Sequence, residues 1–265
     1  MIDPAVTAAV DMLSAAGVPS PRYDAEELAA FVLGVPRSRL GPFSETARAR
    51  YDALVARRAA REPLQHLTGE APFRHLVLAV GPGVFVPRPE TEGLVDLVLA
   101  ECGPGRVAVD LCAGSGAIAA SIAAEAPGTE VHAVELSPEA VMWLRRNGSG
   151  VHIHHADVSG FAGPTADVVV SNPPYLPTQT AVEPEVAADP PLALWGGRDG
   201  LALIPAVLET AARLLRPGGL VALEHDVSHQ VSVLECLRGK GFEDVRGHRD
   251  LTGRDRYVTG RKMPG

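Results

Sequence analysis

Hydrophobic residues recur at two different spacings along the chain, and the change of spacing divides it. In residues 1–72 apolar positions such as Val6, Val10 and Leu13 return every three or four residues, which is typical of amphipathic helices. Asp24 is expected to cap the second of these helices. The pattern therefore predicts a small helical N-terminal domain.

The spacing changes after an arginine-rich segment. A third helix is expected to begin at a capping Ser44 and to run through "SETARARYDALVARRAAREPL", with its arginines on a solvent-exposed face rather than on nucleic acid. In residues 73–86 two short β runs, "LVLAV" and "VFV", flank Gly-Pro-Gly. This arrangement predicts a β-hairpin that links two domains.

Residues 87–265 are expected to form a second domain in which strands and helices alternate. Seven β runs occur from residue 106 onwards: "RVAVDLC", "EVHAVEL", "VHIHHAD", "DVVVS", "LVALEH", "FEDVRGHRD" and "RDRYVTGR". Helical segments separate most of them. The alternation predicts the α/β class, with a doubly wound, mostly parallel seven-stranded sheet and helices on both faces.

A glycine turn follows the first of these strands. In "VAVDLCAGSGAIAA" Asp110 closes the strand, and Gly114 and Gly116 let a ligand approach the backbone where the next helix begins. Glu135 ends the following strand, 19 residues after Gly116, where an acid can accept hydrogen bonds from ribose hydroxyls. The spacing predicts a nucleoside cofactor. A phosphate loop is excluded because Gly-Lys-Ser/Thr is absent, whereas a dinucleotide, S-adenosylmethionine and a ligand-free turn stay open.

The stretch "VVVSNPPYLP" places Asn172, Pro173, Pro174 and Tyr175 directly after a buried strand. Consecutive prolines cannot donate backbone hydrogen bonds, so the strand must end there. The Asn172 side-chain oxygen and the Pro173 carbonyl can both accept from one NH₂ group, and Tyr175 offers an apolar face. Such a socket would aim an amide or amine nitrogen at an electrophilic methyl group by positioning and local electrostatics. The alternative is a simple strand terminator.

Composition and charge narrow the classes of function. The formal net charge of −8 argues against non-specific nucleic-acid binding. Three cysteines without a Cys-x-x-Cys pair favour a reducing compartment, and neither a secretory signal nor a membrane-spanning run is evident. We expect a cytoplasmic monomer with no membrane partner. "HIHH" at 152–155 has no supporting Cys or carboxylate cluster, and the pair His225 and His229 lacks a zinc motif, so no metal site is expected.

These motifs together resemble the peptide chain release factor glutamine methyltransferases nearly end to end. The segments "REPLQHLTGE" and "PRPETE" are the most specific, while Asn-Pro-Pro-Tyr alone is shared with DNA amino-methyltransferases. The resemblance implies a Rossmann-like, S-adenosylmethionine-dependent methyltransferase with an antiparallel last strand. It also implies methyl transfer to the glutamine amide of the Gly-Gly-Gln motif in release factors, with the helical domain gripping the release factor.

The resemblance also assigns roles to individual residues. The S-adenosylmethionine site is implied to comprise a loop, a ribose acid, an adenine neighbour and a shared asparagine: Cys112, Ala113, Gly114, Ser115, Gly116, Glu135, Asp157, Val158 and Asn172. Asn172, Pro173 and Tyr175 are implied to be catalytic and, with Pro174, to hold the glutamine amide. Two positions depart from the family pattern. Cys112 stands where the family has the first glycine of the loop, and Glu135 stands where the family more commonly has Asp.

Three other functions remain to be weighed. A DNA amino-methyltransferase acting on adenine or cytosine would need base flipping and a DNA-reading segment, and this acidic chain shows no such segment. A non-catalytic nucleoside-binding module and a nicotinamide oxidoreductase are the others. We expect no direct nucleic-acid substrate. Arg88 of "PRPETE" and the loop 196–201, whose Asp199 is expected to cap the next helix, have open roles.

Overall fold

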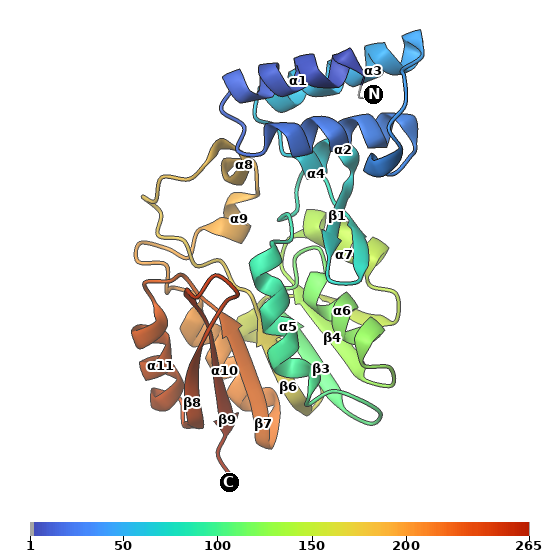
Figure 1. Cartoon of the computed structure of the whole chain (residues 1–265). Coiled ribbons are helices and arrows are strands. Elements are labelled where there is room, and N and C mark those ends of the chain that lie inside the picture. Colours follow the sequence, from blue (N-terminus) through green and yellow to red (C-terminus); the bar gives the residue numbers. More distant parts are fainter. Residues whose placement is uncertain (1–2, 265) are drawn as a thin grey trace. The chain divides into compact units, whose positions relative to one another are not determined.

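The computed structural model describes residues 3–264, which form two compact units (Figure 1). One unit holds the chain up to Glu70 together with Val182–Ala188, and the other holds Ala71–Ala181 and the chain from Asp189 onwards. The chain therefore leaves the second unit after Ala181, contributes a short segment to the first, and returns. The sequence pattern did not predict this excursion.

The first unit is helical. Its elements are α1 (Pro4–Ala15), α2 (Pro21–Leu33), η1 (Arg37–Arg39), α3 (Glu45–Ala59), α4 (Leu64–Thr68) and α8 (Pro184–Ala187). The apolar faces bury Leu13, Leu28 and Tyr51 in one core. Ser44 caps α3 as predicted, because its Oγ accepts from the Ala47 N–H at 3.3 Å.

Two expectations for this unit are wrong. Helix α2 begins at Pro21, so Asp24 lies inside its first turn rather than at its cap, and it accepts a hydrogen bond from Arg58 Nε at 2.7 Å. Arg48, Arg50 and Arg57 of α3 are exposed as expected, but Arg58 of the same helix is buried. A buried guanidinium requires paired acceptors, and a second one comes from Glu185 of α8, 2.7 Å away.

Glu185 holds the segment Val182–Ala188 in the helical unit. It also accepts from Arg61 through two contacts of 2.6 Å. Burial raises the pKa of Glu185, but hydrogen bonds from Arg61 and Arg58 outweigh it and lower the pKa to about 2. The carboxylate is therefore ionised at any physiological pH.

The second unit contains a seven-stranded sheet in the order β5-β4-β3-β6-β7-β9-β8. Its strands are β3 (Val107–Leu111), β4 (Glu130–Glu135), β5 (Val151–His155), β6 (Ala166–Ser171), β7 (Leu215–Glu224), β8 (Phe242–Arg249) and β9 (Asp255–Lys262). Only β9 runs antiparallel to its neighbours β7 and β8. This confirms the doubly wound, mostly parallel sheet and the antiparallel last strand.

Helices cover both faces of this sheet (Figure 1). One face packs against α5 (Glu92–Leu99), α6 (Ala117–Glu125) and α7 (Pro138–Asn147), and the other against α10 (Ile204–Leu214) and α11 (Gln230–Gly239). Side chains alternate accordingly, since Val168 and Val170 belong to the first core and Val169 to the second. Short elements η2 (Pro89–Thr91), η3 (Val158–Gly160) and α9 (Pro191–Leu194) complete the unit. No helix within residues 3–264 is long and apolar enough to span a bilayer.

The predicted hairpin lies elsewhere. Strands β1 (Glu70–Phe73) and β2 (Leu76–Ala79) pair around a turn at Arg74, so "VFV" is not a strand. Val84 and Val86 instead pack in a small core that includes Ala140 of α7. A Cβ at Gly81 would lie 2.6 Å from the Trp143 ring, so Gly-Pro-Gly is a close-packing segment rather than a hairpin turn.

Candidate active site

The candidate site lies at the carboxyl ends of the central strands. Leu111, the last residue of β3, is in register with Val134 of β4 on one side and Ser171 of β6 on the other. The chain winds outward from β3 in both directions, which makes this the switch point of the sheet, where doubly wound folds bind ligands. The glycine turn follows β3, Glu135 is the last residue of β4, and Asn172 directly follows β6.

The glycine turn contains three residues with left-handed backbone: Cys112, Gly114 and Gly116, with φ of 64°, 55° and 85°. A Cβ at Gly114 would meet no atom within 4 Å, whereas one at Gly116 would lie 2.5 Å from Leu144 Cδ1. Gly114 therefore borders open space that a ligand can fill. Gly116 instead allows α6 to pack closely on α7.

Cys112 adopts a conformation that favours glycine, at the position where the family pattern has one. Burial raises the pKa of its thiol well above the usual range, and the charge of Glu135 adds to the effect. The thiol is therefore protonated at neutral pH. This supports a small packed residue rather than a reactive nucleophile.

Glu135 ties the glycine turn to the following helix. Its Oε2 accepts from the Gly114 N–H at 2.7 Å, and its Oε1 accepts from the Ser137 N–H at 2.8 Å. Ser137 is the N-cap of α7. Each carboxylate oxygen keeps a second lone pair, so Glu135 can also accept from ribose hydroxyls.

Asp110 is a fully buried acid beneath the turn. Its Oδ2 accepts from the Ala119 N–H at 3.1 Å, while Oδ1 has no partner among the described residues. Burial raises the pKa of Asp110 to about 8. A buried oxygen without a partner is rare in a native protein, and it leaves Asp110 Oδ1 available to a polar group of a ligand or to water.

Asp157 and Val158 follow β5 at the same edge of the sheet. The Asp157 side chain is exposed and caps η3 by accepting from the Ser159 N–H at 2.7 Å. Val158 is buried. The pair therefore places an apolar side chain and a carboxylate at the carboxyl end of β5.

The Asn172 amide is oriented by a residue of the "PRPETE" segment. Its Nδ2 donates to Thr91 Oγ1 at 3.1 Å, which leaves Oδ1 as the free acceptor. Within residues 3–264 no hydrogen-bond donor reaches Asn172 Oδ1 or the Pro173 carbonyl. Both acceptors identified from the sequence are therefore unpaired.

Glu224 is a site residue that the sequence pattern did not reveal. The Tyr175 hydroxyl donates to Glu224 Oε1 at 3.0 Å. Burial raises the pKa of Glu224 to about 7, while hydrogen bonding from Thr91 and Tyr175 opposes this shift. Burial also holds the pKa of Tyr175 well above its usual value, so its phenol stays a donor. Glu224 therefore anchors Tyr175 and lies close to Thr91, the residue that orients Asn172. The sequence feature that could have indicated Glu224 is its place as an acid near the end of the predicted strand "LVALEH".

Comparison with known proteins identifies the family. Residues 5–69 match the family model described as the PrmC N-terminal domain, and residues 82–189 match the one described as the Methyltransferase small domain. The chain is 50% identical over 271 residues to a release factor glutamine methyltransferase from Streptomyces coelicolor, an alignment that covers 97% of this chain and 96% of that protein. The chain belongs to the release factor glutamine methyltransferase family.

A second relative supports this family assignment, and a solved structure shares the fold. The release factor glutamine methyltransferase of Mycolicibacterium smegmatis is 47% identical over 273 residues, covering 98% of this chain and 97% of that protein. The fold resembles that of a 16S rRNA methyltransferase from T. thermophilus solved with AdoMet and guanosine, with a TM-score of 0.54, 22% identity and coverage of 73% and 49% of the two chains. The AdoMet of that structure is the cofactor that the sequence motifs led us to expect for this chain.

The structure places the two segments whose roles the sequence left open, "PRPETE" and the loop 196–201. Arg88 pairs with Asp189 Oδ2 at 2.5 Å, and Asp189 Oδ1 accepts from the Val86 N–H at 3.1 Å. Arg88 therefore fixes the segment before Thr91. Asp199 does not cap α10, which begins at Ile204; it accepts from the Leu201 N–H within its own loop.

The loop 196–201 packs directly on the Asn-Pro-Pro-Tyr segment. A Cβ at Gly196 would lie 2.6 Å from the Pro174 carbonyl oxygen, and one at Gly200 would collide with the Tyr175 carbonyl oxygen. Leu176 and Trp195 form an isolated bridge between the two segments. The glycines of this loop are needed for close approach.

Proposed function

We propose that the protein transfers the methyl group of S-adenosylmethionine to the side-chain amide nitrogen of the glutamine in the Gly-Gly-Gln motif of peptide chain release factors, in the cytoplasm. The observation that carries this proposal is the unpaired pair of acceptors, Asn172 Oδ1 and the Pro173 carbonyl. They follow the carboxyl end of β6, beside the carboxyl end of β3 where the glycine turn begins. Two oxygens in fixed directions match the two N–H groups of a primary amide.

The acceptors act on a poor nucleophile. An amide nitrogen shares its lone pair with the carbonyl. Hydrogen bonds from its two N–H groups to Asn172 Oδ1 and the Pro173 carbonyl return electron density to the nitrogen. Bound S-adenosylmethionine supplies an electrophilic methyl group on its sulfonium. Asn172 and Pro173 hold the nitrogen in line with that group, so positioning and fixed dipoles provide the rate. Once methylated, the nitrogen loses a proton readily, so no strong base is required.

The remaining side chains keep this socket rigid. Thr91 holds the Asn172 amide in the orientation that exposes Oδ1. Tyr175, anchored to Glu224 by its hydroxyl, is proposed to place its ring against the flat glutamine amide. Prolines 173 and 174 fix the backbone between them. Thr91 and Glu224 are positioning residues, whereas Asn172, Pro173 and Tyr175 contact the substrate.

The cofactor is proposed to lie along the glycine turn. Residues 112–116 would line it, Glu135 would accept from the ribose hydroxyls, and Asp157 with Val158 would flank adenine. Asp110 Oδ1, which lacks a partner among residues 3–264, is available to a polar group of the cofactor or to a bound water. Gly114 leaves the space that this placement needs.

The substrate assignment is tested by mapping the modified atom. The full chain is incubated with methyl-labelled S-adenosylmethionine and a release factor, and the product is digested and analysed by mass spectrometry. The control release factor carries Ala in place of the motif glutamine, and a parallel reaction contains duplex DNA. We expect label on the motif glutamine only. Label on the control release factor, or on DNA adenine or cytosine, would contradict the proposal.

A further inference from the structure

Three histidines and a glutamate gather on one face of the sheet at its β5 edge. Glu130 and His132 alternate along β4, and His152 and His154 alternate along β5, so each pair shares one face. His132 is in register with His152. Glu130 begins β4 whereas Glu135 ends it, so the group lies towards the end of the sheet opposite the candidate active site.

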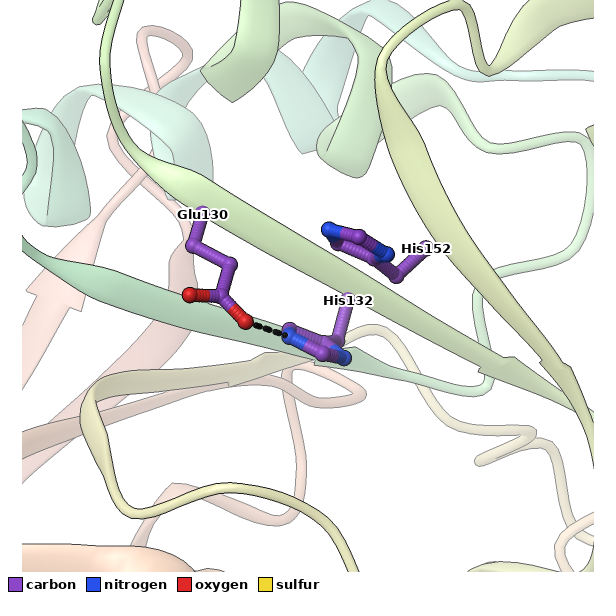
Figure 2. A group of neighbouring side chains, drawn as sticks. All are labelled: Glu130, His132 and His152. Carbon is purple, nitrogen blue, oxygen red and sulfur yellow. Dashed lines mark hydrogen bonds and ion pairs between the residues drawn. The ribbon is translucent and has the colours of Figure 1, made fainter.

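The side chains converge on one another (Figure 2). Glu130 Oε1 lies 2.8 Å from His132 Nε2, and the rings of His132 and His152 are stacked with centroids 4.7 Å apart. One ligand atom from each of these three residues lies within 4.8 Å of the other two. His132 is 7% exposed, while Glu130 and His152 face solvent. An ion can therefore reach the group from water.

His132 is held through both ring nitrogens, which fixes its tautomer. A carboxylate only accepts, so His132 Nε2 carries the proton that it donates to Glu130. Its Nδ1 then accepts from His154 Nε2 at 2.9 Å. Neutral imidazole is the form that binds metals.

We propose that Glu130, His132 and His152 bind one divalent transition-metal ion of the zinc class. Two imidazoles and a carboxylate are a common ligand set for Zn²⁺, with water in the fourth position. Tetrahedral ligands at the usual bond lengths are roughly 3.4 Å apart. Glu130 and His152 are exposed, so their side chains are free to rotate and close the present spacing around His132, with His152 leaving its stack on the His132 ring.

Metal binding would reverse the hydrogen bond between the two histidines. The ion takes the place of the proton on His132 Nε2, and that proton leaves to water. His132 Nδ1 takes the proton of His154 Nε2, and His154 Nδ1 gains one from water, so His132 Nδ1 now donates to His154 Nε2. His154 is then the outer partner that orients a metal ligand. Because the ligands come from β4 and β5, the ion would join the edge strand to the sheet.

The sequence pattern led us to expect no metal site, because no carboxylate lies beside "HIHH" in the chain. The structure supplies Glu130 and His132 from the neighbouring strand. This proposal rests on neither the substrate nor the cofactor of the methyl transfer.

The test is zinc binding by the full chain after treatment with a chelator. We expect one Zn²⁺ per chain in competition with a chromophoric chelator. At free Zn²⁺ about 100-fold above the dissociation constant, the melting temperature should rise by roughly 5–10 °C. His152→Ala and Glu130→Gln, both at exposed positions, should each abolish this rise. His154→Ala should weaken binding by about 10–100-fold.

His75→Ala is the matched control. His75 is an exposed histidine 3.8 Å from a single carboxylate, Glu125, without further ligands, so its loss should leave zinc binding unchanged. Nitrogen NMR of His132 should report the change from the Nε2–H to the Nδ1–H tautomer on adding Zn²⁺. Wild-type zinc affinity in both His152→Ala and Glu130→Gln would overturn the proposal. So would zinc binding that disappears on cysteine alkylation, or an unchanged His132 tautomer.

Discussion

The substitution Glu224→Gln should stabilise the protein at alkaline pH but not at acid pH. Glu224 is fully buried, and its pKa rises from 4.5 to about 7 on folding. The folded state therefore binds this proton more tightly than the unfolded state. The stability that the protonated acid contributes is complete below about pH 4.5 and is lost as the pH rises through about 7. Glutamine has a similar shape and stays neutral throughout.

The size of the effect follows from the same two pKa values. They correspond to about 3 kcal/mol of unfolding free energy at pH 8.5 and to a fraction of this at pH 5. For a sheet unit of this size that is roughly 6–12 °C in melting temperature. Glutamine Oε1 can still accept from Tyr175, so the hydrogen bond to the phenol is kept.

The assay is denaturant unfolding of wild type and variant from about pH 5 to pH 8.5, compared as a difference at each pH. Asp110, whose pKa is also raised, titrates in both proteins and cancels. The nearby Arg256 and Tyr175 are likewise common to both. A stability difference that does not change with pH would show that Glu224 does not titrate in this range and would refute the reasoning.

Three further predictions concern the cofactor turn and the socket. Gly114→Ala should weaken S-adenosylmethionine binding, measured by calorimetry, while the free energy of unfolding falls by only about 1 kcal/mol. Gly116→Ala, whose added Cβ clashes with α7, should lower the free energy of unfolding by about 2–3 kcal/mol, measured by chemical unfolding. Cys112→Gly should change the free energy of unfolding by less than about 1 kcal/mol, because relief of the left-handed backbone strain offsets the added entropy of the unfolded chain. The variant should bind the cofactor as tightly as wild type does. Thr91→Val should lower kcat about 10-fold or more without changing cofactor affinity, and Thr91→Ser should restore it, because only the hydroxyl orients Asn172.

Much of the sheet could be predicted because its signals are local. Runs such as "DVVVS" specify their own strands. Ser137 followed by Pro138 specifies a helix start, and Ser137 caps α7 by accepting from the Ala140 N–H. The glycine turn and Asn172 could be placed at one edge because parallel strands end together. Family motifs then supplied the cofactor and substrate that spacing alone left open.

What the pattern missed depends on partners distant in the chain. Asp24 looks like a helix cap until Arg58, 34 positions later, is found against it. Thr91 and Glu224 join the socket only because β6 and β7 are neighbours in the sheet and η2 reaches Asn172. Gly-Pro-Gly reads as a hairpin turn because nothing local indicates that Trp143 packs against Gly81.

The most direct test of the account is methyl transfer by Asn172→Ala. Cofactor affinity is measured by calorimetry, and single-turnover transfer to a release factor is measured with labelled S-adenosylmethionine. If Asn172 Oδ1 is one of two acceptors that hold the reacting amide, transfer should fall by about 100–1000-fold or more, with the cofactor dissociation constant within about threefold of wild type. Transfer at close to the wild-type rate, or a loss fully explained by weaker cofactor binding, would contradict the central claim.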